Sequence, residues 1–310
     1  MHKKKRVAVV LTALMSSACA TRAVRKERPI VDTSTVLQPL SSRRVVEAPS
    51  KKKQIPEKPK KRAIGKILAD FADNEKRYNA MYELSEADLS SLEAGAAGRI
   101  RDSVLEAMRF DSEVAVPGVK VLGKLADPAA IPELARHSRS REAPVRAAVA
   151  KALANFPRED SVFILIDLMG DRDQNVGRAA VESLGKIGPA AAKTLAPVLA
   201  SGNPDLQYAA VEALSIIGEV GHVVPLFAHN DSKVVYHAVT VAGNIRDTSA
   251  TSALVALMGH TDSNVRGTAA NALRKIGDKS ALGALARAAE NDQSEFVRAA
   301  ARHAVDALNQ

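Results

Sequence analysis

Apolar residues recur at intervals of three and four along most of this chain, the spacing that places side chains on one face of an α-helix. Each stretch opens on an apolar residue, continues through alanines and leucines, and ends on another apolar residue eleven positions later. The opening residues are Val114, Val145, Val176, Leu206, Val234, Val265 and Val297, and they lie 28 to 32 residues apart. The pattern predicts seven related helices, each about fourteen residues long.

Polar residues and glycines predict where these helices begin and end. The residues three positions before the opening ones include Asp111, Asp173, Asn203, Asp231, Asp262 and Ser294. Their side chains can accept hydrogen bonds from the free N–H groups of a helix N-terminus, and Glu142 alone departs from this pattern. Gly188, Gly218 and Gly277 follow three of the helices, where the left-handed conformation of a C-terminal cap favours glycine.

A second apolar set follows each of these helices, such as Val162 with Leu165, or Val223 with Leu226. A helix pair with apolar residues on more than one face cannot be buried alone, but stacking buries each pair against the next. Abundant alanine lets such helices approach closely. Residues 112–310 are therefore predicted to form a right-handed, all-α solenoid of about seven helix-pair repeats.

Residues 63–111 are also apolar at helical intervals, but they lack the repeated motif. Their two stripes are Ile64, Ile67, Leu68 and Phe71, and Ile100, Val104, Leu105 and Met108. The terminal units of repeat arrays are atypical. We therefore expect these residues to form a helical N-terminal cap on the array.

One copy of the repeat reads Val265-Arg266, Ala269, Ala272-Leu273 and Ile276-Gly277-Asp278. This skeleton resembles the short HEAT repeats that are named after phycobilisome lyase subunits. The resemblance covers residues 112–310 and implies an armadillo-like array of helices. It also implies an alternative function, that of a bilin lyase-like or other enzyme-associated subunit, which would act on cytosolic phycobiliproteins.

The first twenty residues have the three regions of a secretory signal. A basic segment, His2 to Arg6, precedes a predominantly apolar run of nine residues, Val7 to Met15, and small residues follow. Nine residues are too few to cross a hydrocarbon core of about 30 Å. Residues 1–20 are therefore predicted to be a signal peptide, and the protein to be exported.

Ser16-Ser17-Ala18-Cys19 resembles the lipobox of bacterial lipoproteins, although Ser16 stands where an aliphatic residue is usual. The resemblance implies that Cys19 is the lipidated first residue of the mature chain and anchors it to a membrane facing the periplasm. Because Ala20 is not Asp, it further implies sorting to the outer membrane. The alternative is cleavage after Ala20, which would leave a soluble periplasmic protein. Cys19 is the single cysteine, so no intramolecular disulfide is possible.

Residues 21–62 end in KKKQIPEKPKKR and contain five prolines without apolar periodicity, which predicts a disordered, basic tether. Residues 1–62 hold 17 of the 44 Lys and Arg residues and 4 of the 35 Asp and Glu residues, so residues 63–310 hold 27 basic and 31 acidic ones. The net charge of +9 thus belongs to the leader and tether, and no specific nucleic-acid partner is expected. Binding of anionic envelope polymers by this tail is an alternative function.

His229 and His260 occupy equivalent turns of neighbouring repeats. Equivalent turns of a helical stack lie about 10 Å apart, too far to share a metal ion, so we interpret both as helix-end residues. Deoxyhypusine hydroxylase, a HEAT-like family that uses metal, is recognised by His-Glu pairs, and no His is followed by Glu here. We expect no catalytic residue, metal, cofactor or small-molecule substrate.

Arg146, Arg266 and Arg298 each follow an opening residue of the repeat. We expect each to pair with an Asp of a neighbouring repeat rather than to bind a ligand. These ion pairs are predicted to be exposed and to contribute only about 0–1 kcal/mol each.

The surface of the second helices is the predicted binding site. In HEAT-like arrays these helices line the concave side, and the candidate contact residues there are Glu133, Arg136, Asp167 and Arg287. A mixed groove of this kind can receive a helix or an extended peptide. The sequence thus predicts a non-catalytic scaffold or assembly factor of the bacterial cell envelope, which binds another protein through its solenoid surface.

Overall fold

A computed structural model describes residues 63–90, 92 and 95–310 of the chain. The predicted signal peptide, Cys19 and the tether lie outside these residues. All regular elements of the described part are helical, and it contains no strand. The N-terminal helices are α2 (Ile64–Ala69), α3 (Arg77–Glu86) and α4 (Ala96–Phe110).

Twelve further helices belong to the repeats. They are α5 (Ala115–Leu125), α6 (Ile131–His137), α7 (Ala143–Leu153), α8 (Glu159–Met169), α9 (Gln174–Ile187), α10 (Pro189–Leu195), α11 (Pro204–Ile217), α12 (Ser232–Ile245), α13 (Thr251–Ala256), α14 (Ser263–Ile276), α15 (Leu282–Asn291) and α16 (Glu295–Asn309). We call α5, α7, α9, α11, α12, α14 and α16 the first helices of the repeats, and the intervening helical segments the second helices.

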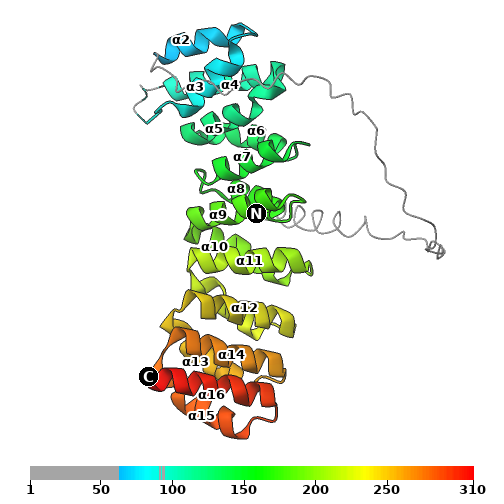
Figure 1. The fold of residues 1–310 in the computed structure, drawn as a ribbon, viewed down its shortest axis with the longest axis vertical. Helices are drawn as coiled ribbons and strands as arrows, with labels where there is room; N and C mark the ends of the chain where they lie inside the picture. Colours follow the sequence, from blue (N-terminus) through cyan, green and yellow to red (C-terminus); the bar gives the residue numbers. More distant parts are fainter. Residues whose placement is uncertain (1–62, 91, 93–94) are drawn as a thin grey trace, which may run out of the picture. The chain divides into compact units, whose positions relative to one another are not determined.

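Each first helix packs on the first helix of the next repeat, and the second helices pack beside them. Figure 1 shows these elements following one another in chain order from α5 to α16. The prediction of an all-α solenoid is therefore confirmed. The helices α3 and α4 pack on α5, so the N-terminal helices share one hydrophobic core with the repeats.

The predicted N-terminal caps form in five repeats. The side chains of Asp111, Asp173, Asn203, Asp231 and Asp262 each accept a hydrogen bond, 2.8–3.1 Å long, from the backbone N–H two residues further on. The side chain of Ser294 makes no such bond, so that cap prediction is wrong. In this turn the backbone N–H of Ser294 instead donates to Asp292 Oδ1 at 2.9 Å.

The three predicted glycine caps have positive φ angles, but only two are left-handed helical. Gly218 and Gly277 have φ of 76° and 82° and adopt the expected αL conformation. Gly188 has φ 72° but ψ −145°, outside that region. The cause is Pro189, which begins α10 directly and disfavours helical ψ in the residue before it.

The second helices are short, and one of them is not an α-helix. Where the sequence predicts a helix, the chain forms two 3₁₀ turns, Val220–His222 and Val224–Ala228, with Val223 between them and Leu226 in the second. Pro225 lies inside the second turn and lacks the N–H that a helical ladder needs. Val223 is nevertheless buried, so the repeat still closes its core.

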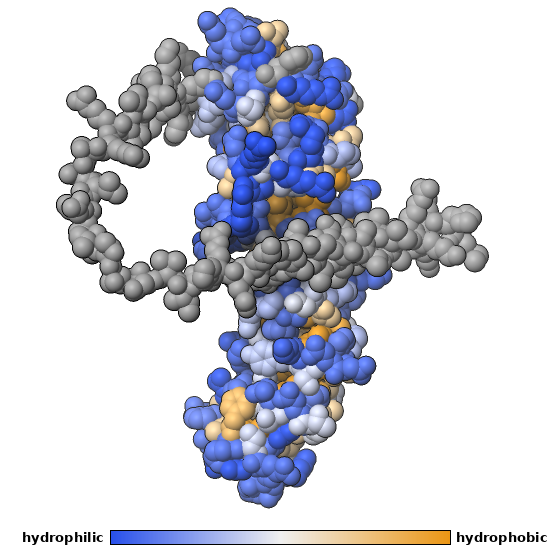
Figure 2. All heavy atoms as spheres, turned by 90° about the vertical axis from the view of Figure 1, so that its right-hand side faces the viewer, coloured by the Kyte–Doolittle hydropathy of each residue, from blue (hydrophilic) through white to orange (hydrophobic). Residues whose placement is uncertain are grey.

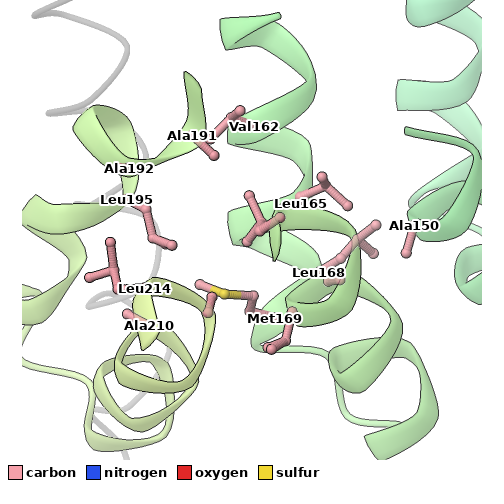
Figure 3. Close-up of a cluster of buried hydrophobic side chains, with 14 of the residues drawn as sticks. Ala150, Val162, Leu165, Leu168, Met169, Ala191, Ala192, Leu195, Ala210 and Leu214 are labelled. Atoms are coloured by element: carbon pink, nitrogen blue, oxygen red, sulfur yellow. The ribbon is translucent and has the colours of Figure 1, made fainter. Parts of the chain in front are cut away.

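Leucines of the second helices and alanines of the first helices form the core between repeats. Figure 3 shows Leu165 of α8, Leu195 of α10 and Leu214 of α11 in one cluster with Ala210. All four side chains are fully buried. The small alanines allow first helices to lie close together, while the leucines fill the space toward the second helices.

Candidate functional site

The four residues predicted to bind a partner lie on second helices. Glu133 and Arg136, one turn apart on α6, form an ion pair, and His137 Nε2 lies 3.2 Å from Glu133 Oε1. The structure thus brings these two residues together. Because Arg136 already neutralises Glu133 and holds its pKa below the usual range, this pair offers little free charge to a partner.

Asp167 and Arg287 do not join that pair. Asp167 is exposed on α8. The side chains around its carboxylate desolvate it and raise its pKa, an effect that the positive charge of Arg139 only partly opposes. Arg287 is exposed on α15, separated from α8 by the repeats that begin with α9, α11 and α12. The second-helix site therefore remains a prediction whose four residues do not form one cluster.

The repeat arginines pair across repeats as predicted, but they are buried. Arg146 Nε and Nη2 donate to the two carboxylate oxygens of Asp171 at 2.7 and 2.8 Å, and these side chains are 6% and 10% exposed. Arg266 binds Asp292 in the same way, with both bonds 2.8 Å long. The predicted partners are thus confirmed, whereas their predicted exposure is wrong because the turns before α7 and α14 cover them.

Arg298 does not make the predicted inter-repeat pair. It pairs with Glu295 on its own helix and donates to the carbonyl of Asp292 at 2.6 Å. The physical reason is that Glu295, one turn earlier on the same helix, lies within reach of the guanidinium.

The turn that supplies the acidic partner also explains the two histidines. Gln207 and Val235 occupy the position that Arg146 and Arg266 hold in their repeats. In the turns that follow, His229 and His260 occupy the position of Asp171 and Asp292. Nδ1 of each His accepts the backbone N–H of the Asp two residues later at 3.0 Å, as Asp171 Oδ1 does in its turn. The histidines therefore hold the turn in repeats that lack the ion pair.

We predict that Asp171→Asn lowers the free energy of unfolding by about 1 kcal/mol. The loss is moderate because Asn keeps an acceptor oxygen and Arg146 Nη1 keeps the carbonyls of Ser140 and Arg141. Urea unfolding followed by circular dichroism measures the change. Glu295→Gln, which affects the exposed pair with Arg298, is the matched control and should change stability by less than about 0.5 kcal/mol. Equal losses would contradict this interpretation.

Large apolar side chains lie exposed on the first helices. The chain has six Phe, four Tyr and no Trp, yet Tyr208, Tyr236 and Phe296 are 63%, 39% and 52% exposed. Ile216 of α11 is exposed as well. Exposed aromatic residues in a chain so poor in them indicate a contact surface, because such residues contribute most to binding at protein interfaces.

Sequence reasoning missed this surface, although a signal for it exists. Tyr208 and Tyr236 each stand two positions after the opening residue of a repeat, and Phe296 stands one position before it. These positions fall outside the buried stripe of the helix. Figure 2 shows one side of the described part, where hydrophilic residues dominate and apolar ones appear in separate patches between them.

A shallow groove of about 410 Å³ runs between α12 and α14. Tyr236 of α12 and Phe296 of α16 line it toward the helix N-termini, and Arg274 and Lys275 of α14 line it toward the C-termini. Thr240, Asn264, Thr268 and Asn271 add hydroxyl and amide groups along it. The groove therefore combines an apolar end with a cationic end.

The first helices are more basic than the rest of the described chain. The seven of them carry twelve Lys and Arg residues against five Asp and Glu residues, whereas residues 63–310 as a whole are slightly acidic. Many of the remaining carboxylates serve as caps in the turns. Two of these cations, Arg146 and Arg266, are already paired with Asp171 and Asp292. The other ten still outnumber the five carboxylates, so the first helices carry an excess of positive charge that would favour an acidic partner.

Comparison with known families agrees with this architecture. The profile of the family described as HEAT repeats matches residues 137–215 and 220–306. The chain belongs to the HEAT-repeat family. Its array is thus a repeat scaffold suited to protein interaction. A comparison with curated proteins gave no match.

Three solved structures are similar to this HEAT array. The karyopherin Kap121p, bound to the extreme C-terminus of the protein phosphatase Cdc14p, is 15% identical with a TM-score of 0.50, over 79% of this chain and 34% of the karyopherin. Human deoxyhypusine hydroxylase is 21% identical, with a TM-score of 0.35, over 79% of this chain and 94% of the enzyme. A HEAT-like repeat protein of Thermococcus onnurineus NA1 is 14% identical, with a TM-score of 0.34, over 70% and 98% of the chains.

Two further features of the HEAT-repeat chain concern membranes and metals. None of the helices in the described part is long and apolar enough to cross a membrane. Within the same residues, no three His, Cys, Asp or Glu side chains are grouped so that they could hold a metal ion.

We expect His237 to make the stability of this array depend on pH. Its ring packs edge-on against Tyr208 and Tyr236, with centroids 5.5 and 5.3 Å away. Burial lowers the pKa of His237, and Asp231 only partly opposes this. The folded state thus favours neutral His237, so its contribution to stability is complete above the unfolded pKa of about 6.5 and is lost as the pH falls below it.

We therefore predict that the melting temperature falls between pH 7.5 and pH 5, and that His237→Gln reduces this fall. Some pH dependence should persist in the variant, because burial also lowers the pKa of His137. Thermal unfolding at the two pH values measures the effect. A variant with the same pH dependence as the wild type would contradict the assignment to His237.

Proposed function

We propose that this HEAT-repeat protein is a non-catalytic scaffold or assembly factor of the bacterial cell envelope, which docks another protein on its solenoid surface. The observation that carries the proposal is the exposure of Tyr208, Tyr236 and Phe296 on first helices of a repeat array. A protein-binding array needs surface rather than a catalytic cluster, and exposed aromatic side chains give a partner its anchoring contacts.

The envelope part of the proposal rests on the amino-terminal sequence. The basic segment, the predominantly apolar run and the Ser-Ser-Ala-Cys stretch support export with Cys19 as an acylated first residue. A diacylated cysteine carries two acyl chains, which are enough for stable anchoring, and the basic tether adds attraction to anionic headgroups. Together they would hold the array at the outer membrane, facing the periplasm.

Intact mass spectrometry of the protein from its native envelope tests the anchor. The expected mature chain begins at Cys19 and carries added acyl mass, which Cys19→Ser removes. A chain that begins at Thr21 would instead give a soluble periplasmic protein, and a full-length mass would contradict export altogether.

Mild crosslinking in cells, followed by purification through a C-terminal tag, tests the scaffold role. We expect one partner protein to be recovered reproducibly with the wild-type chain. The matched control is the same chain with Tyr236→Ala and Phe296→Ala, which removes two exposed rings and should weaken recovery. Failure of the wild-type chain to recover any partner would contradict the proposed function.

A further inference from the structure

We infer that the groove between α12 and α14 docks a peptide segment of the partner protein. This segment is acidic and contains an aromatic or large aliphatic side chain. This inference rests on the proposed scaffold function and names the chemistry of the partner. The apolar side chain of the segment lies between Tyr236 and Phe296, and its carboxylates pair with Arg274 and Lys275. The surface differs from the predicted second-helix site.

The apolar end of the groove is open and preformed. The ring of Phe296 lies over Gly267 of α14, so close that a Cβ atom at this glycine would approach the ring to 2.2 Å. The glycine thus leaves room for the ring to lie against α14, although the side chain stays 52% exposed. Tyr236 is held on the other side of the groove by its edge-on contact with His237. Two rings that are already placed reduce the entropy lost on binding.

The floor of the groove is formed by close helix packing. A Cβ atom at Gly243 of α12 would lie 2.8 Å from both Cα and Cβ of Ala272 on α14. Because the two helices approach this closely, the groove is shallow and admits a single segment rather than a bulky surface. The helix α14 has 14 residues, or about 21 Å, which an extended segment spans with about six residues.

The other end of the groove attracts carboxylates. Arg274 and Lys275 are exposed in the last turn of α14, and no Asp or Glu occurs among the described residues that line the groove. Lys275 Nζ donates to Asn244 Oδ1 at 2.8 Å, which fixes its position without neutralising its charge. Two cations, one of them held in place, without a carboxylate in the groove lining favour an acidic ligand.

A peptide fits this surface better than a long polyanion does. The neighbouring groove between α14 and α16 shares Arg274 but contains Asp306, and Glu212 lies on the outer side of α11. Carboxylates therefore interrupt the positive surface beyond the groove. A nucleic acid or polyphosphate needs a continuous row of cations, whereas a short acidic segment needs only the two at this end.

Selection from a random twelve-residue peptide display library tests the inference. The bait is the full-length chain with Cys19→Ser, which cannot be acylated. We expect the enriched peptides to combine at least two Asp or Glu residues with an aromatic or large aliphatic residue. Reversal of the groove charges with Arg274→Glu and Lys275→Glu should weaken binding by about tenfold or more, and Phe296→Ala should also weaken it by about tenfold.

The matched control is Lys193→Glu, which reverses an exposed charge on the second helix α10 and should leave binding within about twofold. Circular dichroism melting checks that all variants fold. Failure to enrich any peptide, enrichment of neutral or basic peptides, or equal binding after charge reversal would overturn the inference. Equally tight binding of a 20-nucleotide single-stranded DNA, with the same dependence on Arg274 and Lys275, would also overturn it.

The cell-crosslinking experiment separates failure of the groove from failure of the scaffold role. If the Arg274→Glu, Lys275→Glu chain recovers the same partner as the wild type, the groove inference fails and the proposed function stands. If no chain recovers a partner, the proposed function fails as well.

Discussion

Leu195→Ala should lower the free energy of unfolding by about 3 kcal/mol. Leu195 is fully buried in α10, which packs on both α8 and α11. Figure 3 shows its side chain in the space between these helices, near Leu165 and Leu214. Removal of the isobutyl group leaves a cavity among three helices that are fixed by their own neighbours, so the site cannot collapse to fill it.

The loss should also make unfolding less cooperative. Each repeat contacts only its neighbours, so the stability of the array is close to a sum of local contributions. A weakened repeat in the middle therefore lets the repeats on its two sides unfold separately. Urea titration followed by circular dichroism should show an earlier and broader transition. Ile216→Ala is the control, because it removes a large aliphatic side chain that is 53% exposed on α11 and should cost less than about 1 kcal/mol. Equal losses in the two variants would contradict the assigned core.

Gly243→Ala should destabilise the array by about 2 kcal/mol, although alanine is the better helix former by about 1 kcal/mol. Its added Cβ would lie 2.8 Å from the backbone Cα of Ala272. That atom cannot rotate away, so α12 and α14 would have to separate. Gly123 of α5 faces Ala152 of α7 in the same way, which makes this contact a recurring feature of first-helix packing.

Gly98→Ala is the matched control and should have the opposite sign. Gly98 lies in α4, and the nearest atom to its added Cβ would be Nη2 of Arg101 at 3.9 Å, the tip of a flexible side chain. Helix propensity then dominates, and we expect a gain of about 0.5–1 kcal/mol. Thermal unfolding of both variants shows whether each substitution raises or lowers the stability of the array. Stabilisation by Gly243→Ala would contradict the observed helix spacing.

The positions of the helices could be predicted from the sequence because local chemistry determines them. Val176 and Leu184 recur at the helical spacing, and Asp173 supplies the cap that begins α9. Repetition strengthened this evidence, since similar apolar positions occur in every repeat and a polar cap residue in most of them. Even the prediction that Arg146 and Arg266 pair with Asp residues of the next repeat followed from their repeated position.

Features that depend on tertiary contacts were not predictable in the same way. The burial of Arg146 depends on the turn that covers it, and the ψ angle of Gly188 depends on the proline that follows. The groove between α12 and α14 requires Phe296 of α16 to lie over Gly267 of α14, residues of adjacent repeats that no single-helix pattern connects. The second-helix residues Glu133, Arg136, Asp167 and Arg287 came from a resemblance to other arrays, and they lie on three separate helices.

Site-specific photocrosslinking in cells compares the two candidate faces of the array directly. A photoreactive amino acid is placed either at Asn264, an exposed residue that lines the groove, or at Arg287 on α15. Our account predicts a crosslink to one partner protein from position 264, lost when Arg274 and Lys275 are both changed to Glu, and none from position 287. A crosslink from position 287 alone, or from neither position, would contradict it.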